Sequence, residues 1–191
     1  MQIYFVTSNQ SKVLEAKNIL KQFGIEIKEF MVDVPEIKTK TLEETSRWKA
    51  VEALKIIGKE LIVEDTGIFF KAYRNFPGVC SRTVFDAIGY EGIFKLLNGK
   101  PREAWFETVV TYINPEFKLK SFKGICQGSI TTKILGKIDK RFPYDSVFKP
   151  LREKRVFAEM SKEEKAKYSH RGKALEKFAT WYIKAKKERI I

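Results

Sequence analysis

Residues 61–70 are Leu61-Ile62-Val63-Glu64-Asp65-Thr66-Gly67-Ile68-Phe69-Phe70. The aliphatic run 61–63 predicts a short buried strand, because it leaves no polar face for water. Residues 67–70 either continue this strand or pair with it. Two adjacent carboxylates at the end of a buried strand are costly to desolvate, so we expect Glu64 and Asp65 to lie at a sheet edge or crevice.

The segments before this strand predict a β-α-β beginning. Residues 2–7 favour a strand, and residues 11–23 carry apolar side chains at helical spacing before Gly24, a typical helix stop. A second strand is expected over 25–32. A second helix is expected from Thr41-Leu42-Glu43-Glu44, which has capping-box spacing.

The later segments predict antiparallel strands and further helices. We expect a helix at 90–98, a meander of strands at 104–113, 118–126 and 128–135, a turn at 142–145, a strand at 156–159, a capping box at 161–164 and a long helix at 170–188. No linker or repeat divides the chain. The sequence therefore predicts one α/β domain over residues 1–191, a mixed, twisted β-sheet flanked by helices and arranged in two lobes.

The composition limits the class of protein. Of 191 residues, 43% are hydrophobic, which is too many for intrinsic disorder. The 37 basic and 24 acidic residues give a net charge of +13, which implies a polyanionic partner: nucleic acid, an anionic membrane or a phosphate-rich small molecule. Two cysteines and one histidine offer neither a disulfide framework nor a zinc cluster. Since no apolar run would span a bilayer and residues 1–7 do not resemble a signal peptide, we expect a soluble, cytoplasmic protein.

Two polar clusters that follow strands are candidates for phosphate and metal binding. Residues 7–12, Thr-Ser-Asn-Gln-Ser-Lys, combine hydroxyls, backbone N–H groups, a helix N-terminus and a lysine, which suit an anion, although an ordinary helix cap explains them too. Glu64 and Asp65 would suit magnesium, which prefers carboxylate oxygens, whereas the alternative is an exposed strand end. For Glu44, helix capping is a sufficient explanation.

Two clusters in the last third would suit a nucleobase. Ser169-His170-Arg171 begins a helix, where cations are disfavoured, so a bound anion or base edge is one explanation and a surface histidine is another. The donor-only side chain of Arg171 can select a ligand carbonyl over an amino group. In Phe142-Pro143-Tyr144-Asp145-Ser146, aromatic rings flank an acid, which suits base binding or a turn anchored in the core.

The order and spacing of these motifs resemble the inosine triphosphate pyrophosphatases, also called Ham1-like purine nucleoside triphosphatases, over essentially the whole chain. The resemblance rests on Thr7-Ser8-Asn9 with Lys12 and Glu15, Thr41-Leu42-Glu43-Glu44 with Lys49-Ala50, Val63-Glu64-Asp65-Thr66-Gly67, Phe76-Pro77-Gly78, Glu91-Gly92, Phe122-Lys123-Gly124, Phe142-Pro143-Tyr144-Asp145, Phe157-Ala158-Glu159-Met160 and Ser169-His170-Arg171. The chain departs from the usual family motifs at Ser8, Pro143 and Ser146, where the family has glycine, glycine and proline.

The resemblance implies an enzyme that uses Mg²⁺ to hydrolyse inosine and xanthosine triphosphates (ITP, dITP, XTP) to the monophosphate and pyrophosphate, and so cleans the nucleotide pool. It implies two lobes around a central substrate cleft, a homodimer, no stable nucleic-acid partner and no membrane. The implied catalytic residues are Asp65, Glu64 and Lys12, and the implied metal ligands are Glu44 and Asp65. The implied substrate-binding residues are Thr7, Ser8, Asn9, Lys12, Ser81, Phe142, Tyr144, Asp145, Lys165, His170 and Arg171.

The roles implied by the resemblance divide this set by function. Thr7, Asn9 and Lys12 would hold the triphosphate, and Asp65, or Glu64 beside it, would position or deprotonate the attacking water. Phe142, Tyr144 and Asp145 would bracket the base, and Lys165, His170 and Arg171 would contact its edge. A donor that faces a 6-oxo group fits hypoxanthine or xanthine and rejects adenine, whose amino group would oppose it.

Two alternatives remain open at this point. One is a pyrophosphatase for another modified nucleoside triphosphate, because the base motif is altered. The other is a non-catalytic nucleic-acid-binding domain, because the chain is basic.

Overall fold

The computed structural model describes residues 1–35, 37 and 39–191. Within this part of the chain, a seven-stranded sheet has the order β2-β1-β3-β5-β6-β7, with β4 paired to β3. Its strands are β1 (Gln2–Val6), β2 (Glu26–Phe30), β3 (Leu61–Phe70), β4 (Pro77–Gly78), β5 (Glu103–Ile113), β6 (Leu119–Ile130) and β7 (Phe148–Pro150). β1 pairs in parallel with β2 and β3, and the remaining pairs are antiparallel. The predicted mixed sheet is confirmed.

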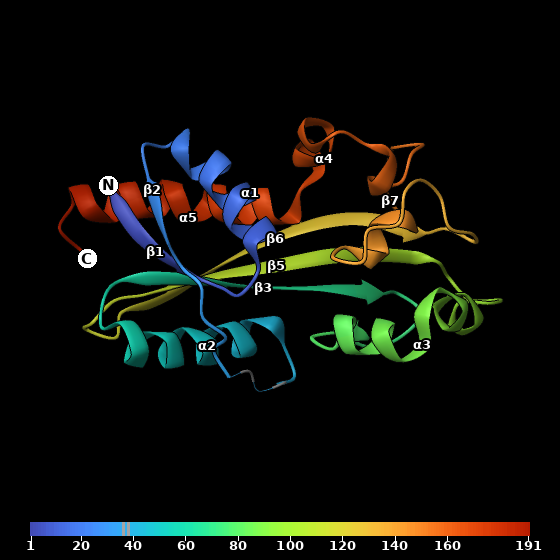
Figure 1. Ribbon diagram of the computed structural model, residues 1–191, viewed down its shortest axis with the longest axis horizontal. Helices are drawn as coiled ribbons and strands as arrows, with labels where there is room; N and C mark the ends of the chain where they lie inside the picture. Colours follow the sequence, from blue (N-terminus) through green and yellow to red (C-terminus); the bar gives the residue numbers. More distant parts are fainter. Residues whose placement is uncertain (36, 38) are drawn as a thin grey trace.

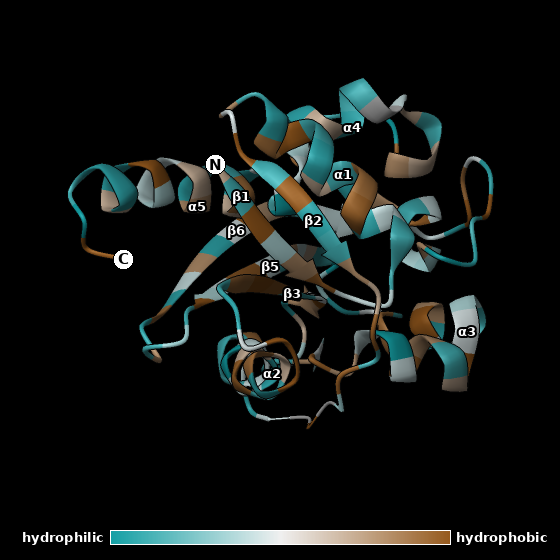
Figure 2. Ribbon diagram, turned by 60° about the vertical axis from the view of Figure 1, so that its left-hand side comes forward, coloured by the Kyte–Doolittle hydropathy of each residue, from teal (hydrophilic) through white to brown (hydrophobic). Residues whose placement is uncertain are grey.

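Helices cover both faces of this sheet (Figure 1). The helices are α1 (Gln10–Lys21), α2 (Leu42–Ile57), α3 (Ser81–Leu96), α4 (Lys162–Tyr168) and α5 (His170–Lys187), with 3₁₀ turns η1 (Pro143–Ser146) and η2 (Phe157–Glu159). α1 and α5 lie on one side of the long strands, and α2 and α3 lie on the other. None of the helices in the described ranges has the length and apolar character needed to cross a bilayer. In Figure 2, hydrophobic residues gather on the central strands β3 and β5.

Alternation along β3 divides the core between these two sides. Ile62 is buried in a cluster with residues of α1 and α5, whereas Leu61 and Val63 are buried with residues of α2. Because successive side chains of a strand point to opposite faces, Glu64 faces α1 and α5 while Asp65 faces α2. A further cluster joins α3 to the far ends of β3, β5 and β6. Glu64 and Asp65 therefore lie along β3 between the clusters that contain residues 61–63 and the cluster that contains Ile68 and Phe70.

Residues 67–70 continue β3, so the first of the two alternatives for this segment is confirmed. Glu64 and Asp65 therefore lie in the middle of a strand, paired with Val110 and Val109 of β5. The prediction that they end the strand is wrong, but the parallel pairing with β1 stops at Ile62. Among the described residues, no strand pairs with β3 on this side between Ile62 and Ile68, so the acids still lie at an edge of the sheet.

Three other segments differ from the sequence prediction. β6 continues through Gly128 to Ile130, so there is no separate strand at 128–135; a Cβ on Gly128 would lie 2.3 Å from the carbonyl oxygen of Lys149, which shows that glycine is needed for the approach of β7. The segment 156–159 is largely the 3₁₀ turn η2. α3 begins at Ser81 and is interrupted at Gly89, with φ 58° and ψ −164°, so only its second half was predicted.

Candidate active site

The first part of the site is the loop between β1 and α1. Asn9 is the N-cap of α1, and its Oδ1 accepts the N–H groups of Ser11 at 3.0 Å and Lys12 at 3.4 Å. The hydroxyl of Thr7 accepts the N–H of Asn9 at 3.1 Å. Ser8 is exposed and does not adopt a positive φ, so the loop does not need glycine there for conformational reasons. Thr7 and Asn9 thus cap the N-terminus of α1.

Lys12 connects this loop to Glu64. Its Nζ lies 3.3 Å from Oε1 of Glu64 and donates to the Glu64 carbonyl oxygen at 3.2 Å. The Glu64 side chain is fully buried, and its Oε1 also accepts the hydroxyl of Thr66 at 2.5 Å. Its other oxygen accepts Nε of Arg171 at 2.6 Å. Glu64 therefore has partners on both carboxylate oxygens.

Arg171 is held between two carboxylates. Besides Glu64, its guanidinium pairs with Glu15 of α1, whose other oxygen accepts the Ser169 hydroxyl at 2.9 Å. Burial alone would raise the pKa of the Glu64 carboxyl, but the charges of Arg171 and Lys12 outweigh it and hold that pKa well below its ordinary value. The contacts Lys12–Glu64–Arg171–Glu15 join α1, β3 and α5 in one buried ionic cluster.

Asp65 lies on the opposite face of β3 with α2. Its Oδ1 lies 3.4 Å from Nζ of Lys49. Glu44 is in the first turn of α2 and is exposed; its N–H donates to the Thr41 hydroxyl at 3.1 Å, so the cap is present. Among the described residues the Glu44 carboxylate has no hydrogen bond or ion pair, so the reciprocal half of the predicted capping box is absent.

The base-binding candidates lie on η1, α4 and the start of α5. Lys165 pairs with the carboxylate of Asp145, and its Nζ lies 4.8 Å from the ring centroid of Phe142. Burial raises the pKa of the Asp145 carboxyl, which the charge of Lys165 only partly offsets. The sequence clusters at 142–146 and 165–171 are therefore brought together.

His170, the first residue of α5, is buried. Its ring stacks on Phe106 with centroids 4.7 Å apart and an interplanar angle of 8°. Burial, followed by the charges of Arg171 and Lys165, holds its pKa well below the ordinary value, so the imidazole is neutral at pH 7. Within the described residues its Nδ1 has no hydrogen-bond partner. A Cβ on Gly124 would lie 2.0 Å from the His170 carbonyl oxygen, so glycine on β6 lets the start of α5 lie this close to the sheet.

Tyr144 and Ser81 have well-defined internal contacts. Tyr144 is 5% exposed and its hydroxyl donates to the carbonyl oxygen of Ser81 at 3.0 Å. The Ser81 hydroxyl donates to the Gly78 carbonyl at 2.5 Å and accepts the N–H of Ile68 at 2.8 Å. In this structure both side chains contribute to packing η1 and α3 against the end of β3.

The structure adds residues that no single motif indicated. Lys49, Glu15 and Thr66 each contact one of the paired acids or Arg171. All three belong to the motifs that carry the family resemblance, but their spacing gave no role to them. Across the described ranges, no group of three or more His, Cys, Asp or Glu side chains could enclose a metal ion.

Comparison with known proteins agrees with this geometry. A family model described as the Ham1 family matches residues 3–181. The chain belongs to the Ham1 family. It is 44% identical over 183 residues to the dITP/XTP pyrophosphatase of Methanopyrus kandleri, covering 95% of this chain and 96% of that protein. It is 38% identical over 180 residues to the inosine triphosphate pyrophosphatase of Yarrowia lipolytica, covering 93% of each.

A solved structure gives the same fold. The HAM1 protein of Coxiella burnetii superimposes with a TM-score of 0.81 at 27% identity, covering 96% of this chain and 100% of that one. The resemblance found in the sequence and the predicted fold class are both confirmed.

Proposed function

We propose that this Ham1 protein uses Mg²⁺ to hydrolyse ITP, dITP and XTP to the nucleoside monophosphate and pyrophosphate, and so cleans the nucleotide pool. The observation that supports it best is the contact series from Lys12 through Glu64 to Arg171, which links a helix N-terminus suited to phosphates with a cluster suited to a base edge. The broader class, a hydrolase of triphosphate anhydrides, is confirmed by the family and its pyrophosphatase relatives.

The triphosphate is assigned to the N-terminal end of α1. Thr7, Ser8 and Asn9 offer hydroxyl, amide and backbone N–H groups there, and the helix dipole favours negative charge. The Nζ of Lys12 lies at the surface of the ionic cluster, with 18% of its side chain exposed, and can turn to a phosphate while Arg171 still neutralises Glu64. Lys49 beside Asp65 supplies a second cation near the reacting phosphate.

The oxygen donors of Glu44 and Asp65 fit Mg²⁺, because this ion takes one or two carboxylates and completes its shell with water and substrate phosphates. The exposed carboxylate of Glu44 has no competing partner among the described residues. When bound, the ion neutralises charge on the phosphates.

Asp65 is our choice of general base. Both oxygens of Glu64 are engaged and its pKa is held low, which makes it an anchor for Lys12 and Arg171 and a poor proton acceptor. In the proposed step the water oxygen forms a bond to the α-phosphorus, the bond from that phosphorus to the bridging oxygen breaks, and pyrophosphate leaves. The water proton passes to the Asp65 carboxylate.

The base is assigned to Phe142, Tyr144, Asp145, Lys165, His170 and Arg171. Phe142 offers a ring for stacking, and the Asp145–Lys165 pair offers an acceptor and a donor side by side. Arg171 can only donate, so it pairs with a 6-oxo group and opposes the amino group of adenine. The buried hydrogen bonds of Tyr144 and Ser81 would hold η1, which carries Asp145, in place against α3.

We assign residues 1–191 to one domain with two lobes around the substrate cleft, acting as a cytoplasmic homodimer without a stable nucleic-acid or membrane partner.

Product analysis tests the proposed activity. The protein is incubated with Mg²⁺ and, separately, with ITP, XTP, ATP and GTP, and the phosphorus products are identified. Pyrophosphate released mainly from ITP and XTP supports the proposal. Orthophosphate release, or no turnover together with tight salt-dependent binding to DNA or RNA, contradicts it. Preference for another modified triphosphate would contradict the substrate assignment alone.

A further inference from the structure

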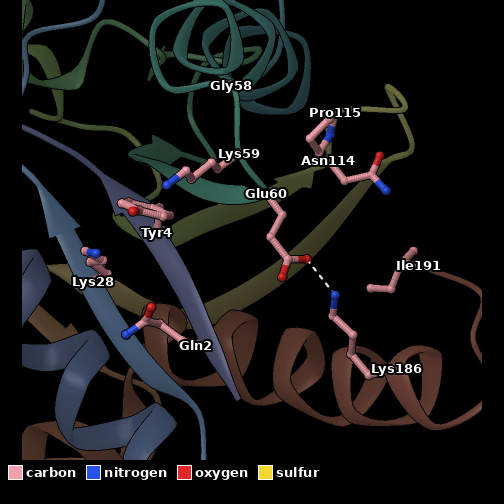
Figure 3. A pocket seen from close by; sticks show the side chains of 10 residues that line it. All are labelled: Gln2, Tyr4, Lys28, Gly58, Lys59, Glu60, Asn114, Pro115, Lys186 and Ile191. Atoms are coloured by element: carbon pink, nitrogen blue, oxygen red, sulfur yellow. Dashed lines mark ion pairs between the residues drawn. The ribbon is translucent and has the colours of Figure 1, made fainter.

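A second candidate site is a hollow of about 510 Å³, shown in Figure 3. It lies at the opposite end of β1 from the loop between β1 and α1. Its walls come from β1, β2, the end of α2, the turn between β5 and β6, and the end of α5. Glu60 lines it, and Asp65 lies five residues further along the chain, about 16 Å at the rise of a β-strand. The hollow is therefore separate from the candidate active site.

Two lysines converge on one side of this hollow. The Nζ atoms of Lys28 and Lys59 lie 5.2 Å and 5.7 Å from the ring centroid of Tyr4. Lys28 is the cross-strand neighbour of Tyr4, and Lys59 follows Gly58, the C-cap of α2. Neither lysine forms an ion pair within the described part of the chain. The negative end of α2 explains a cation at position 59, but not a second one from a neighbouring strand.

The carboxylate in the hollow is already occupied. Glu60 pairs with Lys186 at 2.9 Å, as the dashed line in Figure 3 shows. It also accepts the hydroxyls of Tyr112 at 3.0 Å and Tyr182 at 2.9 Å, two residues that are fully buried. Glu60 is thus part of the packing between β5 and α5, which leaves Lys28 and Lys59 without a counter-charge.

Neutral donors complete the lining. Asn114 is 7% exposed, its Oδ1 accepts the N–H of Lys118 at 2.9 Å, and Figure 3 shows it on the other side of Glu60 from Lys28 and Lys59. The hydrogen bond from Lys28, together with the charges of both lysines, lowers the pKa of the Tyr4 hydroxyl, as expected for a positive local potential.

We propose that this hollow binds a diphosphate group, for which inorganic pyrophosphate is the simplest ligand. The ammonium groups of Lys28 and Lys59 offset its negative charge and donate hydrogen bonds to its oxygens. The proposal does not depend on the catalytic activity and is tested without turnover.

The test is a titration of ¹⁵N-labelled protein followed by NMR, without Mg²⁺. One arm uses pyrophosphate and the other uses adenosine diphosphate, which carries the same group on a nucleoside. We expect saturable shifts at the amides of Tyr4, Lys28 and Lys59. If pyrophosphate binds and adenosine diphosphate does not, the ligand is a free diphosphate anion. If both bind, the site recognises the diphosphate group whether or not it is attached to a nucleoside. Either result supports the proposal.

A pair of double variants separates a specific site from the general effect of charge. The Lys28→Gln/Lys59→Gln variant is expected to weaken binding at these amides at least tenfold. The control Lys71→Gln/Lys95→Gln removes the same charge from exposed lysines that pair with acids elsewhere, and is expected to change the affinity less than twofold. Shifts confined to residues 7–12, no saturation with either ligand, or equal weakening in both variants would overturn the proposal.

Discussion

Replacement of Arg171 by methionine tests the ionic cluster at the centre of the candidate site. The Arg171 side chain is 7% exposed and pairs with Glu64, which is fully buried, and with Glu15, which is 31% exposed. Methionine fills much of the volume but leaves the Glu64 charge with Lys12, at 3.3 Å, as its remaining ionic partner. Removal of one member of a buried ion pair costs about 3–5 kcal/mol, and we expect a loss of stability in this range.

Urea unfolding at pH 7 measures this loss. The matched control is Arg141→Met, because Arg141 pairs with Asp139 at 2.6 Å at the surface, where its side chain is 69% exposed. An exposed pair contributes about 0–1 kcal/mol, so the control is expected to lose no more than that. Equal losses in Arg171→Met and the control would refute the reasoning.

A second substitution shows whether the uncompensated charge causes the loss. Glu64→Gln removes the buried carboxylate charge, so the double variant Glu64→Gln/Arg171→Met is expected to lose less stability than the two single losses added together. A double-mutant cycle with a coupling energy above about 1 kcal/mol supports this explanation. Additive losses would show that Arg171 contributes packing and not charge.

Three further predictions concern the catalytic acid, the buried histidine and the close approach of α5. Asp65→Asn, which keeps the size of the side chain, is expected to abolish pyrophosphate release in protein that remains folded; near-normal turnover would remove Asp65 from the mechanism. His170 is the one histidine of the chain and its pKa is lowered on folding, so protonation favours the unfolded state. The contribution of His170 to stability is therefore complete above about pH 6.5, and below that pH the free energy of unfolding falls by up to about 1.4 kcal/mol per pH unit. In the His170→Gln variant, the free energy of unfolding is expected to depend less steeply on pH between pH 5 and 7. An unchanged dependence on pH would be the contrary result. In Gly124→Ala the added Cβ meets backbone of α5 at 2.0 Å, which should cost more than about 2 kcal/mol in thermal or urea unfolding; a loss below 0.5 kcal/mol would mean that α5 shifts freely.

Local patterns in the sequence predicted much of the fold. The β-α-β beginning and the long last helix depend on periodicity and caps within one segment, and both are present. The sequence could not decide whether residues 67–70 continue β3 or pair with it, because this depends on β5, which pairs with all ten residues of β3. Two strands, 118–126 and 128–135, were predicted where β6 is continuous, because Gly128 pairs with β7, which begins twenty residues later in the chain.

The candidate site shows the same division. Motifs indicated Lys12, Glu64 and Arg171 separately, but only the fold shows that one carboxylate contacts both basic residues. Adjacency in sequence suggested that Glu64 and Asp65 act together, yet the alternation of a strand places them on opposite faces. Tyr144 was assigned to the base from its place in an aromatic motif, and its buried hydroxyl contact with Ser81 depends on α3, whose first half was not predicted.

A competition between two triphosphates in one sample tests the proposed activity and base selectivity most directly. Equimolar ITP and ATP are incubated with the protein and Mg²⁺, and ³¹P NMR follows both substrates and the products. We expect inosine monophosphate and pyrophosphate to appear together while ATP remains. Equal consumption of the two triphosphates, or orthophosphate as the first product, would contradict it.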